Sequence, residues 1–192
     1  MENEVLALIA SFLAMVMVVI SYFVKIKKLY LFFQLMCVIF LIVSYFFSVE
    51  FFAMVGLSIG FCRTLTFYCY ESKGKEAPMA CSFIFSAATI ASYFIVNYGI
   101  LKTANPVDIL CLLPLVMYAF IFRIRNLKLV RFMMPVPTTI AILYNVVSHA
   151  PVFAALSYAF ELAANILSIL KYHVFHQEKK SETVEENINE NS

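Results

Sequence analysis

KIKKL at positions 25–29 returns as RIRNL at positions 123–127, 98 residues further along the chain. Each copy follows one long apolar run and precedes the next. A basic turn repeated at half the chain length indicates two copies of one membrane unit. Many transporters are built from internal repeats of this kind, with the substrate site between the copies. The repeat is therefore the strongest lead to function in this sequence.

The composition indicates a membrane protein. The chain has 192 residues, of which 63% are hydrophobic and 14% charged, and its mean hydropathy is +0.88. A water-soluble domain of this length needs far more polar surface. The net charge of +2 does not indicate a nucleic acid partner, and the five scattered cysteines form no Cys-x-x-Cys pair. We predict an integral membrane protein whose partner is the lipid bilayer, with no cofactor, metal site or nucleic acid partner.

Seven apolar runs reach or approach the roughly 20 residues that cross a bilayer as a helix. Backbone groups cannot stay unpaired in hydrocarbon, so these spans should be helical. The first run has neither a basic segment before it nor a small-residue cleavage site after it, so we interpret it as a retained span. The predicted spans are 5–24, 29–47, 50–70, 79–100, 107–122, 132–147 and 150–171.

The basic residues set the predicted orientation. Of the 14 lysines and arginines, only Arg63 and Lys102 lie away from the segments that follow the odd-numbered spans. The positive-inside rule places those segments in the cytoplasm. We therefore predict an N-terminus outside and a C-terminus in the cytoplasm, which an odd number of spans satisfies.

The repeat also predicts the domain organisation. Spans one to three match spans five to seven, and an odd linker span between them makes the two copies parallel. The predicted fold class is all-α: seven transmembrane helices as two parallel three-helix bundles, 5–70 and 107–171, joined by a linker helix over 79–100. Together they form a membrane domain over residues 1–177. The polar, acidic segment 178–192 is predicted to be a disordered cytoplasmic tail.

This arrangement of three helices, a linker and three helices resembles the SWEET and PQ-loop transporters. The chain more closely resembles the YgjV family of bacterial inner-membrane proteins, over most of residues 5–173. The resemblance is carried by the basic turn after span one, RTL at 63–65, NPVDIL at 105–110 and NIL at 165–167. It implies a bacterial inner-membrane protein of the SWEET plan, in a family without a settled activity.

Two departures from the SWEET proteins concern the site. The kink prolines that the resemblance implies in spans one and two are absent, whereas Pro114 lies in span five and Pro135 and Pro137 in span six. A proline inside a helix breaks a backbone bond and makes a hinge, so mobility is expected in the second bundle. The chain has no tryptophan, so Tyr45 and Tyr144 would have to form any aromatic wall.

Two ionisable residues lie deep inside predicted spans, Arg63 in span three and Glu161 in span seven. An unpaired charge at the bilayer centre costs at least about 2.5 kcal/mol, and such groups are functional candidates by default. The repeat places spans three and seven at equivalent positions. The residues therefore form either a charged-substrate or proton site or a structural ion pair, with Arg63 alternatively extending toward the cytoplasm.

Polar and aromatic side chains complete the predicted substrate site. Asn165 is one turn beyond Glu161 on the same helix face, and Thr64 is its repeat mate. The resemblance to SWEET proteins implies that Asn165 hydrogen-bonds a polar substrate, and the alternative is a helix–helix hydrogen bond. The predicted substrate-binding residues are Arg63, Thr64, Asn145, Glu161 and Asn165, with Tyr45 and Tyr144 as walls.

The segment Gly56–Gly60 reads Gly-x-Ser-x-Gly, the pattern of a serine nucleophile elbow. That motif requires a strand-to-helix turn, whereas this segment is predicted to be mid-helix. The same residues form a Gly-x-x-x-Gly face, which lets two helix backbones approach closely. We predict helix packing here, and no enzyme.

The leading hypothesis is a transporter or facilitator that moves a small polar solute by alternating access. The alternative is a non-transporting scaffold, sensor or partner subunit. The sequence leaves the oligomeric state open, and a homo-oligomer is among the states it allows.

Overall fold

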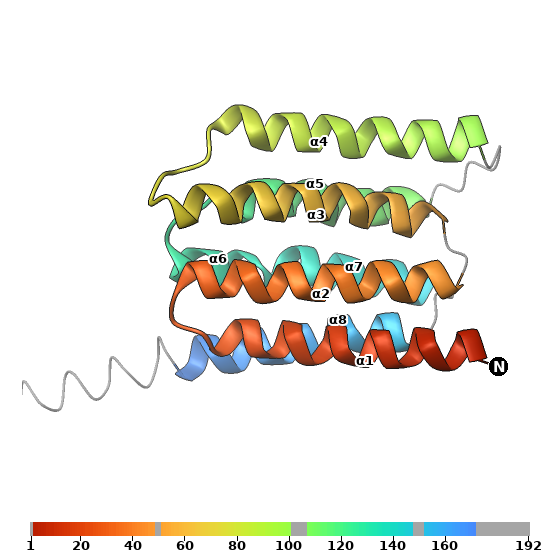
Figure 1. Ribbon diagram of the computed structural model, residues 1–192, viewed down its shortest axis with the longest axis horizontal. Helices are drawn as coiled ribbons and strands as arrows, with labels where there is room; N and C mark the ends of the chain where they lie inside the picture. The colour runs from red at the N-terminus through yellow and green to blue at the C-terminus, as the bar shows by residue number, and fades with distance from the viewer. Residues whose placement is uncertain (1, 49–50, 101–106, 148–151, 172–192) are drawn as a thin grey trace, which may run out of the picture.

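The computed structural model describes residues 2–48, 51–100, 107–147 and 152–171, and every regular element within these ranges is a helix (Figure 1). The chain-order labels follow Figure 1. The elements are α1 Glu2–Phe23, α2 Lys27–Ser48, α3 Phe51–Ser72, α4 Met79–Phe94, the π-helical turn η1 Ile95–Ile100, α5 Asp108–Ile121, α6 Leu127–Met133, α7 Pro135–Val147 and α8 Val152–Ile169.

Each of the seven predicted apolar runs coincides with a helix, and the sixth needs a correction. That run was expected to begin at residue 132, but helix α6 already begins at Leu127. The Asn126 side chain accepts a hydrogen bond from the Lys128 backbone N–H at 3.0 Å, so it caps the helix directly after the basic turn. Met134 joins α6 to α7 with helical backbone angles. The predicted tail, 178–192, lies outside the described residues.

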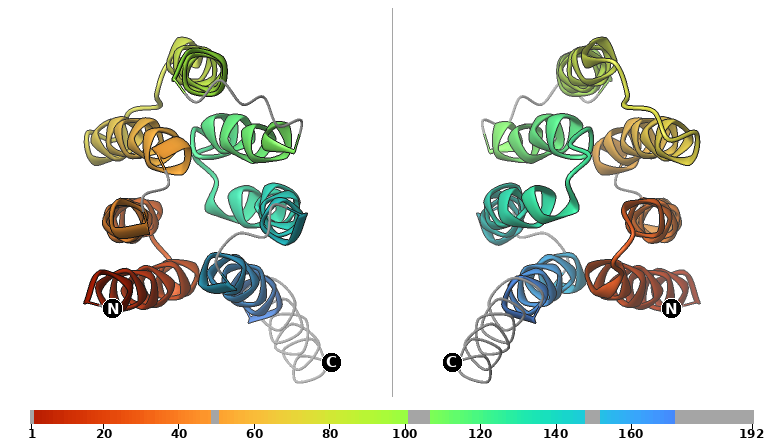
Figure 2. Two further views of the ribbon diagram at one scale, coloured as in Figure 1. Left: turned by 90° about the vertical axis from the view of Figure 1, so that its right-hand side faces the viewer. Right: turned by 90° about the vertical axis from the view of Figure 1, so that its left-hand side faces the viewer.

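The helices form a closed ring (Figure 2). One row runs from α1 through α2 to α3, and a second row runs from α5 through α6 and α7 to α8. Helix α4 bridges the two rows at one end by packing on α3 and α5, and α1 packs on α8 at the other end. We call α1–α3 the first half and α5–α8 the second half. Their interior side chains meet in the middle of the ring.

Four of the helical segments are long and apolar enough to cross a membrane. They are Val5–Phe23, Lys27–Phe47, Met79–Ile100 and Leu127–Val147, and shorter apolar helices cover Ile109–Ile121 and Leu156–Ile169. Large apolar side chains on the outside of the ring are exposed, whereas polar residues such as Gln34, Thr64 and Asn165 are buried. Water-soluble monomers rarely expose so much contiguous apolar surface. These features are those of a helical membrane protein.

The two basic turns lie at the same end of the molecule, together with the turn between α3 and α4 (Figure 1). Lys27 joins them directly, because its Nζ donates to the Arg123 carbonyl at 3.5 Å and lies 3.3 Å from a carboxylate oxygen of Glu71. Arg131 of the second half donates to the Val24 carbonyl of the first half. Lys27 and Arg131 are both buried, so these two cations bridge the halves as well as adding charge to this end.

An aromatic cluster fills the ring beside the basic turns. Tyr22, Tyr30, Phe122 and Tyr118 pack in sequence, with ring centroids 5.7, 6.1 and 5.7 Å apart. Tyr22 and Tyr30 are completely buried, and the cluster joins α1, α2 and α5. It therefore forms the centre of the hydrophobic core at this end of the molecule.

The predicted glycine packing face lies within α3, where the two halves approach each other. A Cβ added to Gly56 would come within 3.3 Å of Leu115 Cδ1 on α5, while Ser58 between the glycines is exposed. The Ser58 hydroxyl donates to the Met54 carbonyl of its own helix at 2.8 Å. The mid-helix position is thus confirmed, and Ser58 is not on a strand-to-helix turn. Close packing against another helix is confirmed for Gly56 alone, because a Cβ added to Gly60 would meet Arg63 of the same helix.

We expect Gly56→Leu to destabilise the protein by about 1–3 kcal/mol, because the added side chain overpacks the contact between α3 and α5. Ser58→Leu introduces the same residue on the exposed face of the same helix and should change stability by less than about 0.5 kcal/mol. Thermal unfolding of the two variants in one detergent measures the difference. Equal stabilities would contradict the close approach at Gly56.

Candidate functional site

A cavity of about 60 Å³ lies at the centre of the ring. Residues of α1, α2, α3, α5 and α8 line it, together with Met134 between α6 and α7. Its two charged residues are Arg63 from the first half and Glu161 from the second. The sequence predicted both residues for the site, and the structure brings them to one cavity.

Arg63 is held between the two halves. Its side chain is 95% buried, since only 5% of it is exposed, and Nη1 donates to the Leu115 carbonyl of α5 at 2.7 Å. The guanidinium carbon lies 5.8 Å from the ring centroid of Tyr118 and 5.4 Å from that of Phe122. Tyr118 belongs to α5 and Phe122 directly follows it, so cation–π attraction to the second half adds to the hydrogen bond. The side chain thus faces the interior and does not extend toward the basic end.

Glu161 is held by the first half. Its Oε1 accepts a hydrogen bond from the Tyr22 hydroxyl at 2.8 Å, and both side chains are buried. Ser168, two turns further along α8, donates to the Tyr22 carbonyl at 2.6 Å. Tyr22 therefore bonds to α8 through its side chain and through its backbone. This pair of bonds fixes the carboxyl group beside the cavity.

Arg63 and Glu161, both within the described residues, form no ion pair with each other. The structural ion pair considered from the sequence is therefore absent. Each group instead bonds to a neutral partner from the opposite half, a carbonyl for Arg63 and a hydroxyl for Glu161. The cavity consequently carries a cationic side chain on one half and a carboxyl group on the other.

Asn165 has a structural partner that explains its position. Pro135 has no N–H, so the Arg131 carbonyl four residues earlier lacks its usual helical donor. The Asn165 side chain supplies one, with Nδ2 donating to the Arg131 carbonyl at 3.0 Å. The Asn165 Oδ1 atom is buried and has no hydrogen-bond partner among the described residues. The helix–helix alternative for Asn165 is thus borne out, and this residue does not line the cavity.

The other predicted polar residues bond within their own helices. Thr64 is completely buried and donates to the Gly60 carbonyl at 2.8 Å, and Asn145 donates to the Ala141 carbonyl at 2.7 Å. Tyr45 and Tyr144 are half-buried. None of these four residues lines the cavity.

Three polar residues that line the cavity were not predicted from the sequence: Gln34, Tyr118 and Tyr158. Gln34 donates to the Ser21 hydroxyl at 3.1 Å, which ties α2 to α1. A glutamine inside an otherwise apolar run is a signal that could have identified it. The tyrosines carried no such signal, because tyrosine is common in this sequence and its hydroxyl position depends on helix rotation.

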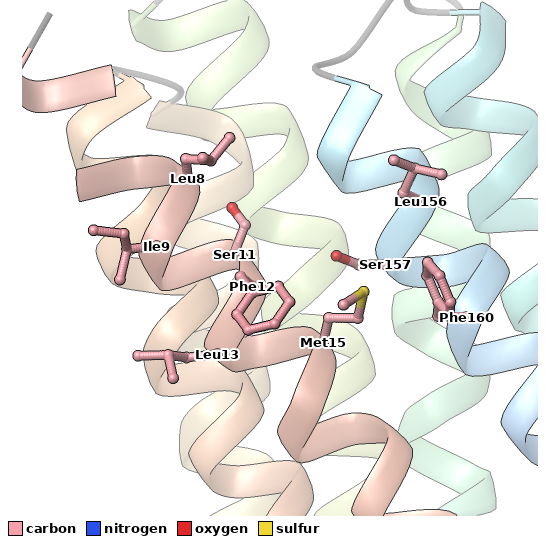
Figure 3. A pocket seen from close by; sticks show the side chains of 9 residues that line it. All are labelled: Leu8, Ile9, Ser11, Phe12, Leu13, Met15, Leu156, Ser157 and Phe160. Carbon is pink, nitrogen blue, oxygen red and sulfur yellow. The ribbon is translucent and has the colours of Figure 1, made fainter. Parts of the chain in front are cut away.

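A larger hollow of about 390 Å³ lies between α1 and α8, away from the two charged residues. Figure 3 shows Phe12 and Met15 of α1 on one side of the gap and Ser157 and Phe160 of α8 on the other. Phe12 and Phe160 are largely exposed, at 59% and 48%. Apart from two serines its lining is apolar, so this hollow offers no recognition of a polar solute.

No family model, curated protein or solved structure matches this chain. In addition, the described residues contain no group of three or more His, Cys, Asp or Glu side chains that could hold a metal ion.

We expect Tyr22→Phe to destabilise the protein by about 1–3 kcal/mol, because it leaves a buried carboxyl oxygen of Glu161 without its donor. Tyr68→Phe is the matched control, since Tyr68 is half-buried and its hydroxyl makes no hydrogen bond within the described residues. Thermal unfolding in detergent compares the two variants. If Tyr22→Phe were as stable as Tyr68→Phe, the bond between Tyr22 and Glu161 would contribute nothing.

Proposed function

We propose that the protein is a transporter or facilitator for a small polar solute, which binds in the central cavity between the two halves. The observation that supports this proposal is the cavity lined by Arg63 of α3 and Glu161 of α8, two ionisable groups that are not neutralised by each other. Such groups inside a membrane protein are retained for substrate or ion pathways more often than for stability. Arg63 and Glu161 are the proposed substrate contacts.

The proposed architecture is that of the SWEET and PQ-loop class. Seven helices would span the membrane, with α1–α3 and α5–α8 as parallel repeats and α4 as the linker between them. The basic turns at one end support the proposal that this end faces the cytoplasm, with the N-terminus outside. The resemblance to the YgjV family supports a bacterial inner membrane as the location.

Alternating access would proceed by rocking of the two halves about the cavity. In the conformation described here, Phe122 lines the cavity, and the aromatic cluster of Tyr22, Tyr30 and Phe122 packs between the halves on the side of the basic turns. Opening to that side requires Tyr30 and Phe122, which belong to opposite halves, to separate. It also requires the bonds from Lys27 and Arg131 to carbonyls of the opposite half to break.

A second candidate is a non-transporting scaffold, sensor or partner subunit. The observation that favours it is the size of the cavity, because 60 Å³ is roughly the volume of two water molecules in the liquid. The buried bonds between the basic turns also favour a static bundle. A transporter must enlarge this cavity during its cycle, whereas a scaffold need not.

Uptake into proteoliposomes distinguishes these candidates. We expect the purified protein to take up at least one solute from a panel of a hexose, a polyol, an amino acid and a monocarboxylate. Glu161→Gln keeps an oxygen acceptor for Tyr22 but cannot ionise, and it should slow that uptake at least about tenfold, or about 1.4 kcal/mol. Ser58→Ala, on the exposed face of α3, should transport like the parent protein. A folded protein without uptake of any member of the panel would favour the scaffold.

Cysteine labelling tests the proposed orientation. In a variant without the five native cysteines, we expect Lys75→Cys, in the exposed turn between α3 and α4, to react with a membrane-impermeant maleimide only after the cells are permeabilised. Val5→Cys, near the start of α1, should react in intact cells. The opposite pattern would reverse the orientation, and labelling of both sites from outside would contradict the odd number of spans proposed between them.

A further inference from the structure

The Arg63 guanidinium has no acidic partner among the described residues. Its neighbours are one carbonyl oxygen and two aromatic rings, and its side chain is 95% buried. Removing a cation from water without an anion nearby is costly, and the cost is greater in a membrane interior. A buried guanidinium of this kind therefore has a strong electrostatic preference for an anionic ligand.

The unused edge of the guanidinium has a defined shape. Nη1 is occupied by the Leu115 carbonyl, whereas Nε is buried without a partner and Nη2 makes no hydrogen bond to any described residue. The N–H groups of Nε and Nη2 point in the same direction from one edge of the planar guanidinium. Two parallel donors of this spacing match the two oxygens of a carboxylate in a bidentate pair.

The space beside this edge lies at its Nη2 end, because Nε itself is buried. Arg63 lines the central cavity, and a Cβ added to Gly60 would lie 3.6 Å from Nη2. The absence of a side chain at position 60 thus keeps the Nη2 end of the edge uncovered. Tyr118 and Phe122 restrict the guanidinium plane from α5, so the edge is held in place before any ligand arrives.

We propose that Arg63 is the anchor of a carboxylate site, and that the solute bound in the central cavity is a small carboxylate paired through Nε and Nη2. The claim that the transported solute is a carboxylate rests on the proposed function. The claim that a carboxylate binds at Arg63 requires only the cavity described here. That cavity is small, so the proposal is restricted to the smallest carboxylates.

Ligand-dependent thermal stabilisation of the full chain in detergent tests this site. Sodium acetate should raise the melting temperature with saturable dose dependence, while its neutral isostere acetamide and equal concentrations of sodium chloride should not. Arg63→Lys keeps the charge but lacks the two-donor edge, so it should weaken acetate binding at least about tenfold. Ser58→Ala, on the exposed face of α3 and outside the cavity lining, should retain acetate binding.

A second variant keeps the test decisive if Arg63→Lys does not fold. Gly60→Ala places a methyl group in ordinary van der Waals contact with Nη2, and it should also weaken acetate binding. The carboxylate site is overturned if acetate gives no saturable shift, if acetamide acts equally, or if both variants bind acetate like the parent protein. Acetate binding without any uptake would overturn only the transport proposal. Uptake of neutral solutes with no acetate binding would overturn only the carboxylate site.

Discussion

Hydrocarbon offers no hydrogen-bond partner, so a polar side chain inside a membrane protein must find one within the chain. In the described part of this molecule, the bonds that meet this requirement often run between the two halves. Arg63 donates to the Leu115 carbonyl, and Arg131 donates in the reverse direction to the Val24 carbonyl. Tyr22 likewise bonds to Glu161. The contact between the halves thus depends on polar groups that have no alternative partner in lipid.

Pro135 makes one backbone carbonyl available as a hydrogen-bond acceptor. Because Pro135 cannot donate a backbone hydrogen bond, it leaves the Arg131 carbonyl open to Asn165 of α8. The same residue, Arg131, uses its side chain to hold the first half. Arg131 therefore bonds to α8 through its carbonyl and to the first half through its side chain. Under the proposed function, bending at Pro135 would change both of these bonds.

The sequence predicted the helices and the depth of the charged residues well, because both depend on local composition. Length and hydropathy located the apolar runs, and charge inside a run identified Arg63 and Glu161. The start of α6 was missed because its first residues, including Lys128, resemble a basic loop until the Asn126 cap is seen. The repeat did not predict the contacts of Thr64, because neighbouring residues on a helix point about 100° apart. Arg63 faces the cavity, whereas Thr64 bonds back to Gly60.

Arg63 and Glu161 differ in how completely their hydrogen-bonding groups are satisfied. The two halves therefore contribute differently to ligand binding in the cavity. The carboxyl group of Glu161 already has a donor from the first half, so bringing the halves together satisfies it. Arg63 keeps two unused donors even when the halves are closed. A ligand that accepts hydrogen bonds from the two unused donors of Arg63 would stabilise the closed ring, as the bond from Tyr22 to Glu161 does. In the proposed cycle, the solute would therefore supply the contact that the chain itself lacks, and its binding energy would favour closure around it.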